Sequence, residues 1–158
     1  MNILIIGLGY AGNRFYSAFK LIAQADKINF AYVNRTKINH ELPCYENIQD
    51  ALDKFKPEII VISTTDNQHV SVMKSLTQYN GFIICEKPLA TPGDGWQVTC
   101  SDLKNISGFA LDLVERYSFA TITLKSMIIE RKWSLVRANF IWGEKSYQRL
   151  PTDVRRNK

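Results

Sequence analysis

Residues 2–15 read NILIIGLGYAGNRF, and they set the architecture of the rest of the chain. A short run rich in isoleucine, residues 2–6, ends at a glycine and predicts a buried parallel strand. Apolar side chains then recur at helical spacing, at Ala11, Phe15, Ala18, Phe19 and Ile22. A strand, a glycine-rich loop and a helix in that order predict the first unit of an α/β fold.

The loop between this strand and helix follows the pattern G-x-G-x-x-G, with Gly7, Gly9 and Gly12. In this context Gly7 permits a tight turn, Gly9 lets the backbone approach a pyrophosphate, and Gly12 lets helix and strand pack closely. Tyr10 and Ala11 lie in the same loop, where free N–H groups at the helix N-terminus attract phosphate. We therefore expect these five residues to bind a dinucleotide in a Rossmann domain. The alternative is a glycine-rich turn of another α/β fold.

The residues after the second predicted strand, 28–33, indicate which dinucleotide binds. An acidic residue there accepts hydrogen bonds from the ribose 2′-hydroxyl of NAD. This chain has Asn34 and Arg35 instead, and a guanidinium can hold a 2′-phosphate with two hydrogen bonds. The sequence thus predicts that NADP(H) is preferred over NAD(H). A solvated basic loop is the alternative reading.

Strands and helices alternate through the first two thirds of the chain. Further strands are predicted at residues 58–63, 82–85 and 108–114, and helices at 48–55, 70–76 and 118–131. Residues 91–95 form a loop, and only a poor helix follows it up to residue 104. Residues 133–142 alternate between apolar and polar, which is typical of a strand. This alternation predicts an α/β, doubly wound parallel sheet with right-handed crossovers.

Two further segments follow predicted strands, so their side chains face the ligand crevice of such a sheet. The first, TTDNQH, contributes Thr64, Thr65, Asn67 and His69, and the second is CEKPLA at residues 85–90. Their candidate cofactor-binding residues are Thr64, Thr65, Asn67, His69, Glu86 and Lys87. A lysine held by a proline turn can present a cation or proton donor to a substrate oxygen, which makes Lys87 the candidate catalytic residue. Taken singly, Lys87 is also a common surface residue, and His69 a common residue at the start of a helix.

Composition argues against several other classes of protein. The formal net charge is +5, but residues 144–158 hold five basic and two acidic residues, so the excess sits mainly in a basic tail and nucleic-acid binding is not expected. No apolar run is long enough to span a membrane or to form a signal peptide, which predicts a cytoplasmic protein. Cys44, Cys85 and Cys100 are widely spaced, so neither a metal site nor a disulfide framework is indicated.

Together these segments resemble the glucose–fructose oxidoreductase / inositol dehydrogenase family (Gfo/Idh/MocA). The glycine loop, the segment from Thr65 to His69 and the CEKPLA block look like its hallmarks, and residues 115–118 resemble its arginine-bearing segment before a linking helix. The resemblance implies hydride transfer between a nicotinamide and a hydroxyl or carbonyl carbon of a sugar-like or polyol substrate. It implies that Lys87 lies beside the reacting oxygen, that Glu86 shapes the turn near the nicotinamide, and that Pro88 follows a cis peptide.

The resemblance also implies the domain organisation. We expect a dinucleotide-binding domain at residues 1–117, a linking helix and first strand of a truncated α+β substrate domain at 118–143, and a basic tail at 144–158. The family's second domain supplies most substrate contacts and a catalytic histidine, which have no counterpart here. The chain could therefore be a shortened NADP-dependent oxidoreductase, a module that binds NADP(H) without turnover, or a subunit completed by another chain. An apolar face on residues 133–142 further predicts a homo-oligomer.

Overall fold

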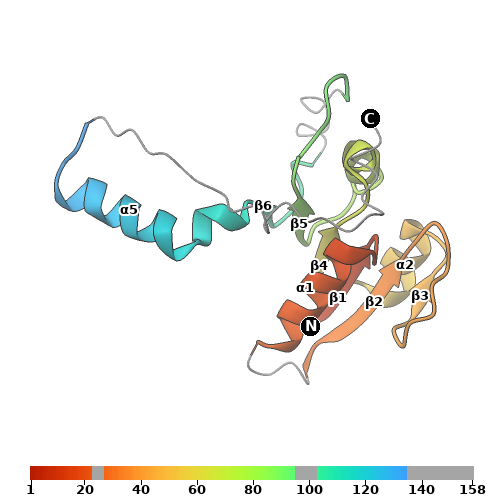
Figure 1. Cartoon of the computed structure of the whole chain (residues 1–158). Coiled ribbons are helices and arrows are strands. Elements are labelled where there is room, and N and C mark those ends of the chain that lie inside the picture. Colours follow the sequence, from red (N-terminus) through yellow and green to blue (C-terminus); the bar gives the residue numbers. More distant parts are fainter. Residues whose placement is uncertain (23–26, 95–102, 135–158) are drawn as a thin grey trace, which may run out of the picture. The chain divides into compact units, whose positions relative to one another are not determined.

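The computed structural model describes residues 1–22, 27–94 and 103–134 (Figure 1). The chain divides into two compact units, Met1–Val114 and Glu115–Lys158. The sequence places a boundary slightly later, after residue 117, and that boundary stays a prediction. The strand expected at 133–142 and the basic tail lie outside the described residues from position 135 onward.

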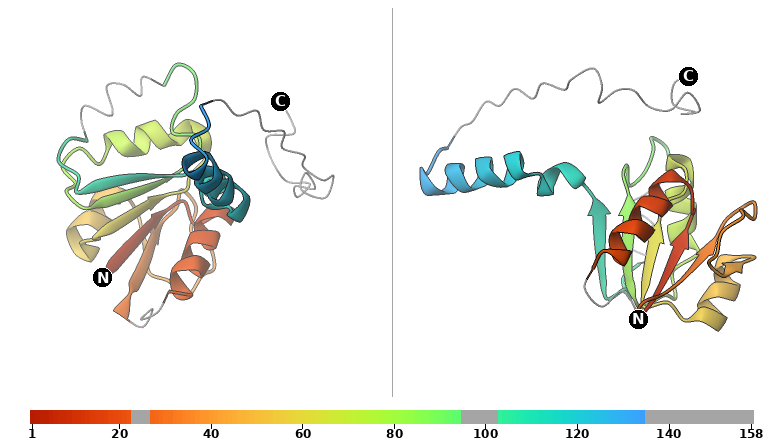
Figure 2. Two further views of the ribbon diagram at one scale, coloured as in Figure 1. Left: turned by 90° about the vertical axis from the view of Figure 1, so that its left-hand side faces the viewer. Right: turned by 60° about the horizontal axis from the view of Figure 1, so that its bottom comes forward.

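The first unit is built on a six-stranded sheet in the order β3-β2-β1-β4-β5-β6. All its neighbouring strands pair in parallel. Figure 2 shows the strands fanned out with helices on both sides. The strands are β1 (Asn2–Ile6), β2 (Asn29–Val33), β3 (Cys44–Tyr45), β4 (Ile59–Ile62), β5 (Phe82–Glu86) and β6 (Gly108–Asp112). The predicted doubly wound parallel sheet is confirmed, and its order reverses between β1 and β4.

Among its described residues the first unit holds three α-helices, and capping residues explain where α2 begins and ends. They are α1 (Tyr10–Lys20), α2 (Ile48–Phe55) and α3 (His69–Lys74), with a 3₁₀ turn η2 (Asp66–Gln68) before α3. Asn47 caps α2, because its side-chain oxygen accepts a hydrogen bond from the backbone N–H of Asp50 at 2.8 Å. The helix ends at Phe55, and its C-cap residue Lys56 takes a left-handed conformation directly before Pro57.

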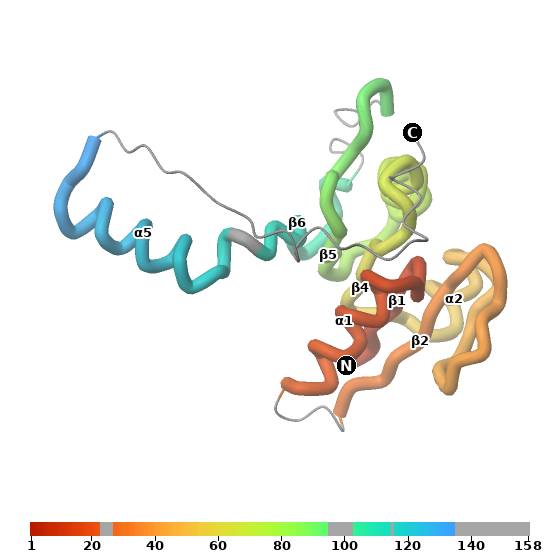
Figure 3. Tube along the Cα trace, in the orientation of Figure 1, coloured from red at the N-terminus to blue at the C-terminus, as the bar shows by residue number. Residues whose placement is uncertain are grey.

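The core occupies both faces of the sheet, as the apolar composition of the strands requires. In β1, Leu4 and Ile6 join a cluster with Ile60, Met73 and Leu76 on one face. Ile3 and Ile5 join a second cluster with Leu8, Tyr32 and Val61 on the other face. Because alternate residues of a strand point to opposite faces, β1 is buried on both sides. Figure 3 traces this central strand between β2 and β4.

The structure differs from the sequence prediction mainly at element boundaries. Strand β5 continues to Glu86, β6 stops at Asp112, and α3 begins at His69 and ends at Lys74. Strand β3 was not predicted, since two residues are too few to show any periodicity; it pairs Cys44 with Tyr32. The poor helix expected up to residue 104 falls largely on residues 95–102, outside the described part of the chain.

The second unit holds a 3₁₀ turn, η3 (Val114–Tyr117), which begins at the last residue of the first unit, and α5 (Phe119–Glu130). Ser118 caps α5 by accepting a hydrogen bond from the backbone N–H of Thr121 at 3.2 Å. The helix carries apolar residues around most of its circumference, and none of its residues is buried. Among the described residues, no helix is both long and apolar enough to cross a membrane.

Candidate functional site

The predicted site residues gather at the carboxyl edge of the sheet. Gly7 follows β1, Asn34 follows β2, Thr64 lies two residues after β4, and Lys87 follows β5. The strands are parallel, so these positions meet at one edge, on both sides of the point where the strand order reverses. Open α/β sheets bind their ligands at this place.

The three glycines of the first loop differ in what surrounds them. Gly7 has a φ of +95°, and a Cβ there would lie 2.7 Å from the backbone nitrogen of Thr64. A Cβ on Gly12 would overlap the carbonyl oxygen of Gly7. A Cβ on Gly9 would meet no atom of the described residues within 4 Å, its two chain neighbours aside. The fold itself therefore requires Gly7 and Gly12, whereas Gly9 borders open space at the start of α1, as a cradle for a pyrophosphate demands.

Asn34 ties the end of β2 to this loop. Its side-chain oxygen accepts a hydrogen bond from the backbone N–H of Leu8 at 2.6 Å, and the N–H of Gly7 donates to the carbonyl of Val33 at 2.9 Å. Arg35 is exposed, as is Tyr10, while Ala11 is half-buried. The sequence marks Asn34 only as a replacement for an acidic residue after the second strand, and its acceptor role toward the loop was missed.

His69 joins the loop after β4 to the loop after β5. Its ring is fully buried, with Nδ1 2.7 Å from the carbonyl oxygen of Pro88 and Nε2 3.2 Å from that of Thr64. The ring donates to these carbonyls through whichever nitrogen carries a proton. Both ring nitrogens thus face backbone carbonyls, and the predicted cofactor contact of His69 stays a prediction.

The loop after β4 also presents hydroxyl and amide groups. Thr65 Oγ1 donates a hydrogen bond to the side-chain oxygen of Asn67 at 2.8 Å, and both residues are exposed. Thr64 Oγ1 is buried and has no hydrogen-bond partner within the described residues. An orphaned hydroxyl beside the glycine loop fits a site that a polar ligand completes.

The turn after β5 is held by ionic and backbone contacts. The Lys87–Pro88 peptide is cis, as the family resemblance implied. The Glu86 carboxylate accepts a hydrogen bond from the backbone N–H of Lys87 at 2.8 Å. It also forms an ion pair with Arg14 of α1 at 3.0 Å. Arg14 forms a second ion pair with Asp112 at the end of β6. The side chain of Lys87 is exposed. No sequence pattern points to Arg14 and Asp112, which stand 98 residues apart and share no motif.

Cys85 lies next to this turn but is not suited to covalent chemistry. Burial raises the pKa of its thiol to about 12, and the neighbouring Glu86 carboxylate acts in the same direction. A thiol so rarely ionised is a poor nucleophile.

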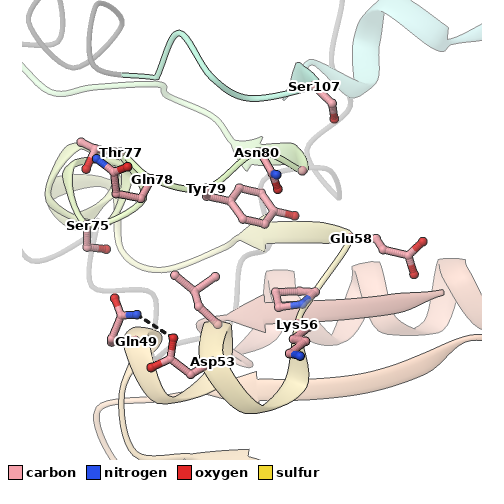
Figure 4. Close-up of a pocket in the computed structure, with 13 residues that line it drawn as sticks. Gln49, Asp53, Lys56, Glu58, Ser75, Thr77, Gln78, Tyr79, Asn80 and Ser107 are labelled. Atoms are coloured by element: carbon pink, nitrogen blue, oxygen red, sulfur yellow. Dashed lines mark hydrogen bonds between the residues drawn. The ribbon is translucent and has the colours of Figure 1, made fainter.

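A groove of about 830 Å³ lies at the opposite, amino edge of the sheet (Figure 4). It is bordered by α2 and by the segments that precede β4, β5 and β6, and a hydrogen bond of 2.9 Å joins Gln49 to Asp53 on its rim. None of the residues predicted to bind a cofactor lines it. Burial, and to a lesser degree the Glu58 carboxylate, raises the pKa of Tyr79 in its wall, so this phenol stays protonated.

Comparison with known proteins agrees with this geometry. A myo-inositol 2-dehydrogenase from Lactobacillus plantarum is 20% identical, with a TM-score of 0.71 over 86% of this chain and 43% of that one. The WlbA dehydrogenase from Chromobacterium violaceum, solved with NADH and UDP-GlcNAcA, is 15% identical, with a TM-score of 0.70 over 85% and 41%. A myo-inositol dehydrogenase from Lactobacillus casei, solved with NAD(H) and myo-inositol, is 17% identical, with a TM-score of 0.68 over 82% and 41%.

At such identities these structures show a shared fold, and the chain spans about two fifths of their length. No curated protein matches the chain. The model of the oxidoreductase family with an NAD-binding Rossmann fold, GFO_IDH_MocA, matches residues 1–106, which is more than half of the 158 residues. The chain therefore belongs to the Gfo/Idh/MocA family of oxidoreductases and carries its NAD-binding Rossmann fold.

Proposed function

We propose that this chain binds NADP(H) in preference to NAD(H) and contributes this site to an oxidoreductase of sugar-like or polyol substrates. The open space at Gly9, directly before α1, is the observation that carries the proposal. A phosphate placed there meets the free backbone N–H groups and the positive end of the helix dipole. The orphaned hydroxyl of Thr64 on the adjoining loop supports the same location.

The preference for the phosphorylated cofactor rests on the end of β2. The side-chain oxygen of Asn34 is engaged with Leu8, so its amide nitrogen can donate to a 2′-phosphate, and Arg35 adds an exposed guanidinium. Neither residue carries the negative charge that would repel this phosphate.

Lys87 is the proposed catalytic residue. A bound nicotinamide would donate or accept the hydride. The ammonium of Lys87 stabilises negative charge on the reacting oxygen and exchanges a proton with it. The solved relatives with bound myo-inositol and UDP-GlcNAcA support a polyhydroxylated substrate.

Calorimetric titration of the full chain with NADPH and with NADH tests the cofactor proposal. NADPH is expected to bind more tightly. Arg35→Ala is expected to weaken NADPH by about tenfold to a hundredfold while leaving NADH unchanged, since a charge-assisted contact contributes roughly 1.5–3 kcal/mol. Lys37→Ala removes an equal charge two residues away and serves as the matched control. Tighter binding of NADH by the unaltered chain contradicts the proposal.

Turnover of polyols such as myo-inositol with NADP⁺ tests the proposed role of Lys87. Lys87→Ala is expected to lower kcat by about a hundredfold or more while leaving the Kd of NADPH unchanged. Equal losses in both quantities would make Lys87 a binding residue. A chain that binds NADPH and turns over no polyol matches the alternative of a binding module.

A further inference from the structure

Arg14 holds together two carboxylates at the carboxyl edge of the sheet. Glu86 and Asp112 are the last residues of β5 and β6 and stand opposite each other in the register of this strand pair. One guanidinium nitrogen of Arg14 pairs with Glu86 Oε1 at 3.0 Å and also with Asp112 Oδ2. The two acidic side chains are only 15% and 14% exposed, so their mutual repulsion is poorly screened by water.

The net charge of the cluster of Arg14, Glu86 and Asp112 changes by one unit when any one of these side chains is replaced by a neutral one. With Arg14 present, the three side chains sum to one negative charge; without it they sum to two. Removing the charge of Asp112 leaves a neutral pair. Two substitutions of similar size thus move the local charge in opposite directions.

The position of the cluster in the fold relates this charge to the dinucleotide. A doubly wound sheet binds a dinucleotide across two halves, and the residue after β2 faces the adenosine ribose. The half formed by β4, β5 and β6 therefore faces the nicotinamide, and Glu86 and Asp112 end two of its three strands. The nicotinamide ring is positively charged when oxidised and neutral when reduced, so its two forms respond differently to a negative field.

We propose that Arg14 sets the preference between oxidised and reduced dinucleotide by compensating the charges of Glu86 and Asp112. This inference rests on the proposed dinucleotide binding. Arg14 acts through the two carboxylates and is therefore a positioning residue. Its contact with Glu86 holds the turn after β5, and its positive charge reduces the negative electrostatic potential at the nicotinamide.

The test compares NADP⁺ with NADPH in calorimetric titrations of the full chain. The ratio of the two Kd values in Arg14→Gln is expected to shift about fivefold toward NADP⁺. In Asp112→Asn the ratio is expected to shift by a similar factor toward NADPH. Arg14→Lys keeps the charge and is expected to stay within about twofold of the unaltered chain. Lys20→Gln removes a charge from the last turn of the same helix and serves as the matched control.

A loosened structure weakens both forms of the cofactor alike, so equal losses in Arg14→Gln would overturn the inference. A shift in the same direction for Arg14→Gln and Asp112→Asn would overturn it as well. If Arg14→Gln fails to fold, the direction of the Asp112→Asn shift decides. A chain that binds neither NADP⁺ nor NADPH refutes the proposed function itself. If both bind and the ratio of their Kd values is the same in the variants as in the unaltered chain, only the role of Arg14 is refuted. The shifts are expected to shrink in concentrated salt.

Discussion

The two loops that form the candidate site are fixed in opposite ways. Residues 7–12 approach their neighbours so closely that Gly7 and Gly12 have no room for a side chain. Residues 86–88 are held by side chains from elsewhere, namely the ring of His69 and the guanidinium of Arg14. The first loop depends on two positions that have no side chain, and the second depends on side chains supplied by distant residues. Added atoms should therefore damage the first loop, and removed atoms the second.

The largest expected effect comes from adding one methyl group to the first loop. In Gly12→Ala the new Cβ overlaps the carbonyl oxygen of Gly7, a backbone atom that cannot yield without moving the loop. We expect a loss of about 4 kcal/mol in the free energy of unfolding, measured by urea denaturation. Gly9→Ala is the matched control and should cost no more than about 1 kcal/mol.

A second change at the control position separates stability from binding. Gly9→Val is expected to leave the fold intact and abolish dinucleotide binding, because the larger side chain fills the space proposed for the pyrophosphate. Normal NADPH affinity in this variant would show that the phosphate site lies elsewhere.

Removing atoms from the second loop gives the next largest effect. His69→Leu deletes both contacts of a fully buried ring and leaves the carbonyls of Thr64 and Pro88 without this partner. We expect a loss of about 3 kcal/mol in thermal or urea unfolding. Ser71→Ala alters an exposed hydroxyl in the same helix and should stay within about 0.5 kcal/mol. An equally small loss in His69→Leu would mean that the two loops are held independently.

The smallest expected stability effect tests a side chain that supports the first loop from the end of β2. Asn34→Ala removes the acceptor for the N–H of Leu8 and is expected to cost about 1 kcal/mol. Asn34→Asp keeps an acceptor oxygen in the same place but adds a negative charge. It is expected to retain more stability than Asn34→Ala while reversing the preference from NADPH to NADH, as measured by calorimetry. An aspartate variant that still favours NADPH would contradict the assignment of Asn34 to the 2′ position.

The same contrast explains how much could be predicted from sequence. The glycine loop was predictable, because Gly7, Gly9 and Gly12 lie within one short segment and follow a recognisable spacing. The parallel sheet was predictable as well, from apolar runs and their spacing. The cluster of Arg14, Glu86 and Asp112 was not, because only the pairing of β5 with β6 and the path of α1 bring these charges together. The sequence marks His69 as a candidate residue, but its contacts with the carbonyls of Thr64 and Pro88 depend on the paths of two loops, which no local sequence pattern encodes.

The order of the strands also has a consequence for biosynthesis. Among the described strands β1 leaves the ribosome first, and it lies in the interior of the sheet, between β2 and β4. At about 5–20 residues per second, the last residue of β4 follows that of β1 after roughly 3 to 11 seconds. Through this interval one edge of β1 has no partner. The backbone of Ile3, Leu4 and Ile5 thus stays unpaired along this edge until β4 has been synthesised.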